Sequence, residues 1–168
     1  DALRGRALVF LVLLWFLWFM NFTLRTIFAP IIPLVEDEFA INHAKASSLF
    51  VFQSLGYGTS VLFSGFLSGL FGHKRSITVS LLMSAAIFLL LPFFKSFAAI
   101  SVCIFILGLS AGVYMPSVMP IITERFSERI WGKTIAIHDS AAAIGIFSTP
   151  FVALAILRQR PDRSDGRR

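Results

Sequence analysis

The sequence predicts an all-α protein, a polytopic membrane bundle of about five transmembrane helices. Of the 168 residues, 57% are hydrophobic and only 14% are charged, whereas soluble domains are about 45–50% apolar and about 25% charged. The mean hydropathy is +0.81, and the apolar residues fall into five long runs, most of them close to the ~20 residues that a bilayer requires. Short polar turns separate the runs, so neighbouring helices should form antiparallel hairpins in one bundle.

The first run extends from about residue 7 to 35. Because this is longer than a bilayer needs, we expect the helix to tilt or bend. Pro30 and Pro33 should disturb its last turns, and the acidic triplet 36–38 should close it. The run is not a cleaved signal peptide, because its apolar character continues past Ile32, no small-residue cleavage site follows and further apolar runs come after it.

The four further spans are predicted over residues 46–71, 76–94, 97–123 and 134–157. Asn42 or Ser47 is a candidate cap for the second of these five helices. In the fourth span, glycines and prolines recur every fourth residue, at Gly108, Gly112, Pro116 and Pro120. They form a smooth ridge along which a neighbouring backbone can approach closely, and the prolines should kink the helix.

Basic residues are distributed unequally between the two sides of the predicted bundle. The side that carries the N-terminus holds seven of them: Arg4, Arg6, Lys74, Arg75, Arg125, Arg129 and Lys133. The other side holds two, Lys45 and Lys95, together with the acidic triplet. By the positive-inside rule the N-terminus should be cytoplasmic. We therefore expect a multi-pass protein of the cell membrane.

The bundle should occupy residues 1–157, and the hydrophilic tail 158–168 breaks the charge pattern. The tail carries five Arg and two Asp and follows a span that should end outside the cell. Three interpretations are a short exterior tail, a re-entrant final segment, or sequence foreign to the fold, such as a frameshifted or trimmed product. We favour the last, and the start at Asp1 also suggests trimming.

The net charge of +6 does not indicate a nucleic-acid partner, because the basic residues lie between apolar runs and not on one amphipathic face. The single cysteine, Cys103, excludes an intrachain disulfide, and no spacing of ligand residues suggests a metal or another cofactor. A membrane-embedded enzyme is disfavoured, because the sequence shows no paired intramembrane carboxylates, no His/Glu metal spacing and no Ser-His pairing.

The turn between the second and third spans carries the most informative motif, which runs over residues 64–75. Gly65, Gly69 and Gly72, with the serine between them, should allow close helix packing, and Lys74 and Arg75 follow directly. This pattern resembles the signature between the second and third helices of the major facilitator superfamily of secondary transporters. Gly69 stands where that family usually has Asp, and Leu70 where it usually has Arg, so the family's gate contact should be absent or made differently.

The fourth span and the loop after it are also similar to the family, over residues 108–117 and 124–133. The Arg that many proton-coupled drug exporters carry in this helix would fall near Ile104 and is absent, which disfavours that branch. The resemblance covers about residues 5–157, the first five of usually twelve helices. It implies alternating access in a complete transporter whose missing remainder is a partner of this segment.

Arg25 is the strongest candidate for binding a substrate, since a charge at membrane depth costs at least ~2.5–3.5 kcal/mol and is retained for function by default. Asn21 lies one turn before it on the same face. An Arg fork suits a carboxylate or phosphate, and in several anion-transporting branches of the resembled family a first-helix Arg faces the cavity. The alternatives are that Arg25 reaches to the exterior surface or pairs with the acidic triplet.

His138 and Asp139 lie inside the fifth span and form a candidate proton-coupling pair, because His titrates near neutral pH and Asp can accept its proton. The alternative is a structural pair that involves Lys133 or Arg129. Further candidates for substrate contact are polar groups of the second and fourth spans: Gln53, Tyr57 and Tyr114. Interhelical bonding is their commoner use, and Trp15 and Trp18 should face lipid.

These observations together predict a secondary active transporter, a symporter for a small solute, most plausibly an organic anion. A small stand-alone membrane protein with a structural or assembly role is the alternative.

Overall fold

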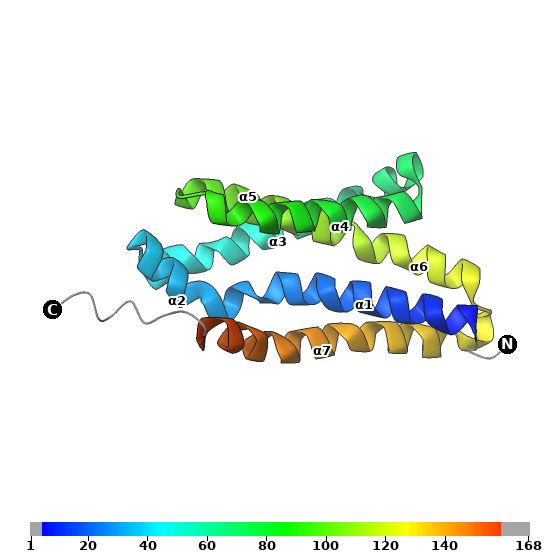
Figure 1. The fold of residues 1–168 in the computed structure, drawn as a ribbon. Coiled ribbons are helices and arrows are strands. Elements are labelled where there is room, and N and C mark those ends of the chain that lie inside the picture. The colour runs from blue at the N-terminus through cyan, green and yellow to red at the C-terminus, as the bar shows by residue number, and fades with distance from the viewer. Residues whose placement is uncertain (1–4, 159–168) are drawn as a thin grey trace.

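The computed structural model describes residues 5–158, and Figure 1 shows them as long helices lying roughly side by side. Every regular element of this described part is helical, which confirms the all-α class. Five helical segments are long and apolar enough to cross a membrane. Of the tail that was expected to lie outside the fold, only Arg158 is described, and it ends the last helix; residues 159–168 lie outside the described residues.

The first span consists of α1 (Arg6–Thr26) and α2 (Phe28–Phe39), and the second is α3 (His43–Phe71). The third is α4 (His73–Leu90) with the 3-10 turn η1 (Leu91–Phe93). The fourth consists of α5 (Phe97–Gly112) and α6 (Tyr114–Arg125). The 3-10 turn η2 (Glu128–Ile130) leads into the fifth, α7 (Trp131–Arg158).

The first and fourth spans are each interrupted once, at Ile27 and at Val113. Each interruption lies three residues before a proline, Pro30 or Pro116. A proline removes the backbone hydrogen bond to the fourth residue before it, and its ring clashes with that carbonyl. The expected bend in the first span therefore falls one turn before the proline. Pro33, Pro120 and Pro150 lie within helices that continue past them.

The link between the first two spans is short. Ala40, with a φ of 50°, adopts the left-handed conformation that ends α2. The side-chain oxygen of Asn42 then accepts a hydrogen bond of 2.9 Å from the backbone N–H of Lys45. Of the two candidate caps, the helix therefore uses Asn42.

Glycines set the contact between α3 and α5, the most closely packed pair of helices. A Cβ atom added to Gly56 would overlap the carbonyl oxygen of Phe105, and one added to Gly108 would overlap that of Gln53. At Gly112 a Cβ would lie 2.6 Å from the carbonyl oxygen of Tyr57. The two backbones thus touch directly, which confirms the close approach predicted for the ridge of the fourth span.

The expected close approach at the motif glycines is not seen in the described part. A Cβ atom added to Gly65, Gly69 or Gly72 would have no neighbour within 4 Å. The small residue between them makes the contact instead: Ser68 is buried, and its hydroxyl lies 3.0 Å from that of Ser117.

The packing of the bundle repeats in inverted form. The second most closely packed pair is α1 with α7, where a Cβ on Gly145 would lie 3.2 Å from the carbonyl oxygen of Phe19. Phe19 and Phe105 are separated along the chain by the same interval as Ile27 and Val113, and as Pro30 and Pro116. Figure 1 shows α1 and α5 running in opposite directions. The first and fourth spans therefore play equivalent roles, as do the second and fifth.

Two apolar clusters follow the same repeat. In the first, Tyr114 packs against Leu11, Leu14 and Trp18 of α1. In the second, Phe28 packs against the residues one repeat further along α5, which are Phe97, Ile100 and Ile104. In each cluster, an aromatic ring that follows the break in one span therefore packs against the N-terminal half of the other broken span.

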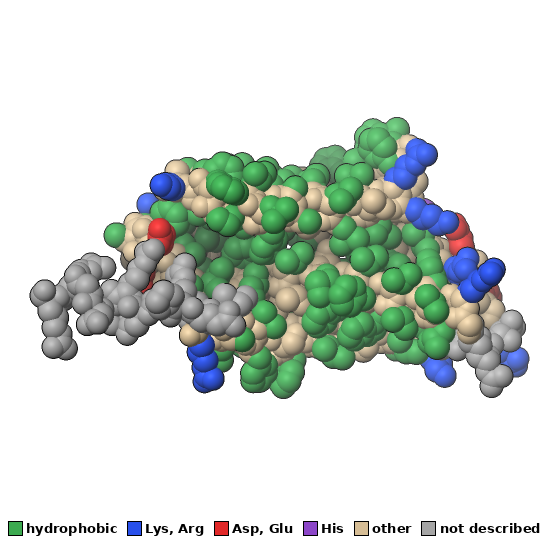
Figure 2. Space-filling view, in the orientation of Figure 1, with side chains coloured by type: hydrophobic (Ala, Val, Ile, Leu, Met, Phe, Trp, Pro, Cys, Tyr) green, Lys and Arg blue, Asp and Glu red, His purple; other side chains and the backbone are tan. Residues whose placement is uncertain are grey.

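On the face shown in Figure 2, the charged side chains lie at the two ends of the bundle, and apolar side chains cover the middle. The end that carries α1's first turn also carries the exposed Lys74, Arg75 and Arg125. Lys45 and Lys95 lie at the other end.

Replacing Gly108 with Ala should destabilise the protein by about 3 kcal/mol, the upper end of the range for overpacking, because rigid backbone blocks the new methyl group. Gly58→Ala is the matched control, since a Cβ there meets nothing within 4 Å, and it should stabilise by up to about 1 kcal/mol through helix propensity. Thermal unfolding in detergent measures both. Equal effects of the two variants would contradict the backbone contact.

A cysteine placed at the exposed Ser127, beside α6, should react with a membrane-impermeant maleimide only after cells are permeabilised. One placed at the exposed Ser96, before α5, should react in intact cells, because the excess of basic residues predicts that the first end lies in the cytoplasm. The native Cys103 is buried and should stay silent. The reverse labelling pattern would show that the orientation is wrong.

Candidate solute-binding site

Arg25 lies near the middle of the first span, which extends over 34 residues from Arg6 to Phe39. At 1.5 Å per residue it lies more than about 20 Å along the helices from either end. Its side chain is partly buried. The position is therefore well within the apolar part of the bundle, where an unpaired charge is expensive.

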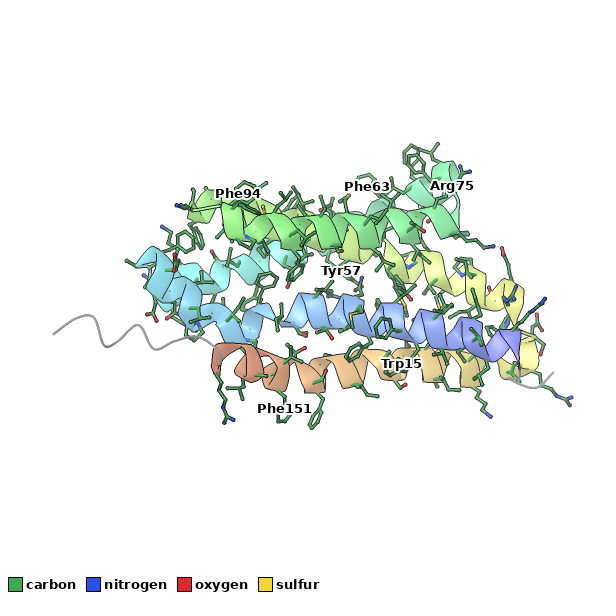
Figure 3. The ribbon with its side chains drawn as sticks, in the orientation of Figure 1. Trp15, Tyr57, Phe63, Arg75, Phe94 and Phe151 are labelled. Atoms are coloured by element: carbon green, nitrogen blue, oxygen red, sulfur yellow. The ribbon has the colours of Figure 1, made fainter. Side chains whose placement is uncertain are left out.

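Two aromatic rings hold the guanidinium of Arg25. Its central carbon lies 4.1 Å from the ring centroid of Tyr57 and 5.0 Å from that of Phe22. Figure 3 shows Tyr57 between the ribbon of α1 and the layer formed by α3, α4 and α5. Such cation–π contacts are worth about 2 kcal/mol where the groups are desolvated.

No acidic side chain of the described residues lies within 4.0 Å of Arg25. The expected alternative, pairing with the acidic triplet, is not observed: Glu36 instead pairs with His43, whose Nδ1 lies 2.6 Å from the carboxylate. The guanidinium therefore keeps hydrogen-bond donors that no carboxylate of the described part accepts.

Asn21 and Gln53 lie beside this arginine with different roles. Gln53 donates a 3.2 Å hydrogen bond from its side-chain nitrogen to the backbone carbonyl of Arg25, and so ties α3 to α1. Asn21 is 3% exposed, and its side-chain oxygen has no hydrogen-bond partner among the described residues. Buried polar atoms without a partner are rare and call for an explanation.

Tyr114 does not join this group. It is fully buried, and its hydroxyl donates a 2.9 Å hydrogen bond to the carbonyl oxygen of Leu14. The same hydroxyl lies 3.3 Å from Nε2 of His138. The structure therefore divides the predicted site residues into an arginine group (Asn21, Arg25, Gln53, Tyr57) and a histidine group (Tyr114, His138, Asp139).

Trp18 packs against the histidine group, although the sequence predicted that it would face lipid. Trp18 is instead 4% exposed and stacks on Tyr114 and His138, with ring centroids 4.9 and 5.6 Å apart. Because the residues around Trp18 in the sequence are apolar, the sequence did not indicate that it would be buried against Tyr114 and His138. The neighbouring Trp15 donates a 3.0 Å hydrogen bond to the hydroxyl of Ser140 and so joins α1 to α7; Figure 3 labels its side chain.

His138 and Asp139 are in contact, as expected. Nδ1 of His138 lies 3.2 Å from a carboxylate oxygen of Asp139. The imidazole is fully buried, whereas the carboxylate side chain is 46% exposed. The alternative pairing with Lys133 or Arg129 is not present, since neither lies within 4.0 Å of this carboxylate in the described part.

The motif residues lie at the end of the bundle that carries the first turn of α1. Gly65 and Gly69 are exposed on α3, and Gly72, with a φ of 77°, makes the turn into α4. Lys74 and Arg75 are exposed in the first turn of α4.

A cavity of 330 Å³ also lies between α3, α4 and α5. Its walls are almost wholly apolar, and none of the predicted site residues lines it.

Inverted packing around broken helices, with polar side chains at mid-depth, is typical of secondary transporters. Residues 14–160 match the sequence model described as the Major Facilitator Superfamily. The chain therefore belongs to this family of membrane transporters, which points away from an enzyme.

A similar curated protein is the "Protein TsgA homolog" of Buchnera aphidicola subsp. Schizaphis graminum (strain Sg), which is 27% identical over 126 residues. The match covers 75% of this chain and 33% of the relative, so the chain spans about a third of that protein's length. No solved structure matches the chain.

Replacing Tyr57 with Leu should destabilise the protein by about 1–2 kcal/mol, because the arginine loses the aromatic face on which it rests. Tyr57→Phe keeps that face and should change stability by less than about 0.5 kcal/mol. Thermal unfolding of the purified protein separates the two. Equal losses would show that the hydroxyl matters and that the ring face does not.

Proposed function

We propose that this chain forms part of a secondary active transporter for a small organic anion, with Arg25 as the residue that binds the anionic group. The observation that supports this most is the arginine at mid-depth with aromatic contacts and without an acidic partner in the described part. An anion from outside the chain would supply the missing partner.

The chemistry of the arginine group fits a carboxylate. The guanidinium presents a planar fork that matches the two oxygens of a carboxylate. Aromatic rings on its face fix its plane and leave its edge for the ligand. Asn21, four residues earlier on the same face of α1, adds an amide that can bond a second polar group of the solute.

The spans described here would supply one side of a path that further spans complete, since the chain covers about a third of its relative. Alternating access would come from rocking of the two halves of the complete transporter around the site. We place the transporter in the cell membrane with its N-terminus in the cytoplasm, which the unequal distribution of basic residues supports.

We further propose that transport is coupled to protons, as a symport, with the proton held by His138 and Asp139. The exposed carboxylate beside a fully buried imidazole supports this. A carboxylate inside a span, about 12 Å along the axis from the start of α7, is costly against lipid, so its exposed side is expected to face a water-filled path.

Arg25→Lys in the complete transporter should lower uptake of the transported carboxylate by about 10- to 100-fold, which corresponds to one charge-assisted bidentate interaction. The ammonium keeps the charge but not the fork. Arg129→Lys, in the exposed loop before α7, is the matched control and should keep wild-type uptake. Uptake of labelled carboxylates, phosphates and sugars into proteoliposomes provides the measurement.

If Arg25→Lys left uptake of every anion in the panel unchanged, the assigned role of the arginine would be wrong. Uptake of a neutral sugar alone would contradict the anionic substrate. No uptake of any solute would favour a structural or assembly role for the protein.

A further inference from the structure

We infer that Tyr114 transmits the protonation state of the His138–Asp139 pair to the first span, by moving its hydroxyl hydrogen between the Leu14 carbonyl and His138. This inference rests on the proposed proton coupling and names the group that converts proton binding into a change between helices. Three observations support it: the hydrogen-bond pattern, the stacking of Trp18, and the residues at the equivalent positions of the inverted repeat.

The Tyr114 hydroxyl has two acceptors within reach, the carbonyl oxygen of Leu14 at 2.9 Å and Nε2 of His138 at 3.3 Å. A hydroxyl carries one hydrogen, and in the first arrangement Tyr114 donates it to the nearer acceptor, the carbonyl of Leu14. Nε2 of His138, 3.3 Å from the same hydroxyl oxygen, must then carry a hydrogen and donate it. This arrangement therefore requires a hydrogen on Nε2.

A second hydrogen is needed on the other side of the ring. Nδ1 faces a carboxylate oxygen of Asp139 at 3.2 Å. With Nε2 already protonated, two acceptors would face each other unless one more proton lies between them. The arrangement in which Tyr114 donates to Leu14 therefore corresponds to the protonated pair, an imidazolium hydrogen-bonded to a carboxylate.

Loss of that one proton reverses the network. A neutral imidazole with its hydrogen on Nδ1 donates to the Asp139 carboxylate and leaves Nε2 as an acceptor. The hydroxyl of Tyr114 can then satisfy Nε2 only by leaving the carbonyl of Leu14. One proton departs through the half-exposed carboxylate, the hydrogen bond between α6 and α1 is lost, and the hydrogen bond between α6 and α7 reverses its direction.

Trp18 favours the protonated form. Its ring lies nearly parallel to that of His138, with an interplanar angle of 18° and centroids 5.6 Å apart. An imidazolium over an indole face gains a cation–π attraction that a neutral imidazole lacks. The group thus has a reason to hold a proton even though it is fully buried.

The other charged groups of the packed helices lie too far away to replace Asp139 in this role. On α1, Arg25 is seven residues beyond Trp18, about 10 Å along the axis, and Arg6 is at the first turn. On α6, Glu124 and Arg125 are at least ten residues beyond Tyr114, about 15 Å. On α7 itself, Lys133 is exposed and lies about 7 Å along the axis before His138.

The inverted repeat shows that packing alone does not require these polar residues. At the equivalent positions, one repeat interval away, Ile104 corresponds to Trp18 and Phe28 corresponds to Tyr114. The interval between Leu49 and His138 equals that between Gly56 and Gly145, so Leu49 occupies the position equivalent to His138. The second cluster is therefore built on the same backbone plan with apolar side chains alone. Because burying polar groups costs free energy, their presence in only one cluster indicates a function.

The direct test is the imidazole ¹⁵N spectrum of the unmodified complete transporter in detergent, recorded from about pH 5 to 8 with labelled histidine. His138→Leu, which copies the residue at position 49, identifies the His138 signals. We expect both nitrogens protonated at low pH and the Nδ1–H tautomer after deprotonation. A neutral Nε2–H tautomer would overturn the inference. This measurement does not depend on uptake and so stands apart from the anion hypothesis.

The functional test is the pH profile of uptake. Tyr114→Phe introduces the residue found at the equivalent position 28. It should reduce the ratio between the highest and lowest uptake rates across the pH range by about two- to tenfold, the factor that one hydrogen bond contributes to an equilibrium. Leu49→Ile, a change of similar size in the apolar cluster, should leave the profile as in the wild type. A wild-type profile in Tyr114→Phe would also overturn the inference. If Arg25→Lys lost all uptake while His138 titrated as in the wild type, this result would agree with both the anion-binding role of Arg25 and the proton switch at Tyr114.

Discussion

Direct backbone contact between the second and fourth spans is the constraint on which the rest of the bundle depends. Gly56, Gly108 and Gly112 bring α3 and α5 so close that no Cβ atom fits between them. The same kind of contact, at Gly145, joins α7 to α1. With both pairs fixed, the breaks at Ile27 and Val113 fall at equivalent heights. Each break then places an aromatic ring, Phe28 or Tyr114, on the opposite broken span.

The two halves of this repeat share packing but differ in polarity. The positions equivalent to Asn21 and Arg25 are Leu107 and Ala111, and those equivalent to Gln53 and Tyr57 are Ala142 and Ile146, so the arginine group has no counterpart. The histidine group likewise has an apolar counterpart. Since the fold tolerates apolar residues at these places, the polar ones are best explained by solute and proton binding, and both groups involve α1.

The sequence predicted the helical class and the five spans well, because long apolar runs and the prolines act locally. It also predicted Arg25 and His138 as candidate site residues, since charged or titratable residues stand out in apolar segments. The partners of these residues depend on helix packing and were less accessible. Tyr57 was a candidate for substrate contact, but neither its contact with Arg25 nor the burial of Trp18 was predicted. Equal spacing of Phe19, Ile27 and Pro30 with Phe105, Val113 and Pro116 could have revealed the repeat.

The central claim is that Arg25 finds its ionic partner in the transported solute. The most direct measurement is a structure of the complete transporter with a bound carboxylate identified in the uptake panel. The account predicts both carboxylate oxygens about 2.7–2.9 Å from the Arg25 guanidinium nitrogens, with Tyr57 still beneath the guanidinium. An acidic side chain of the remaining spans paired with Arg25, with the solute bound elsewhere, would contradict it.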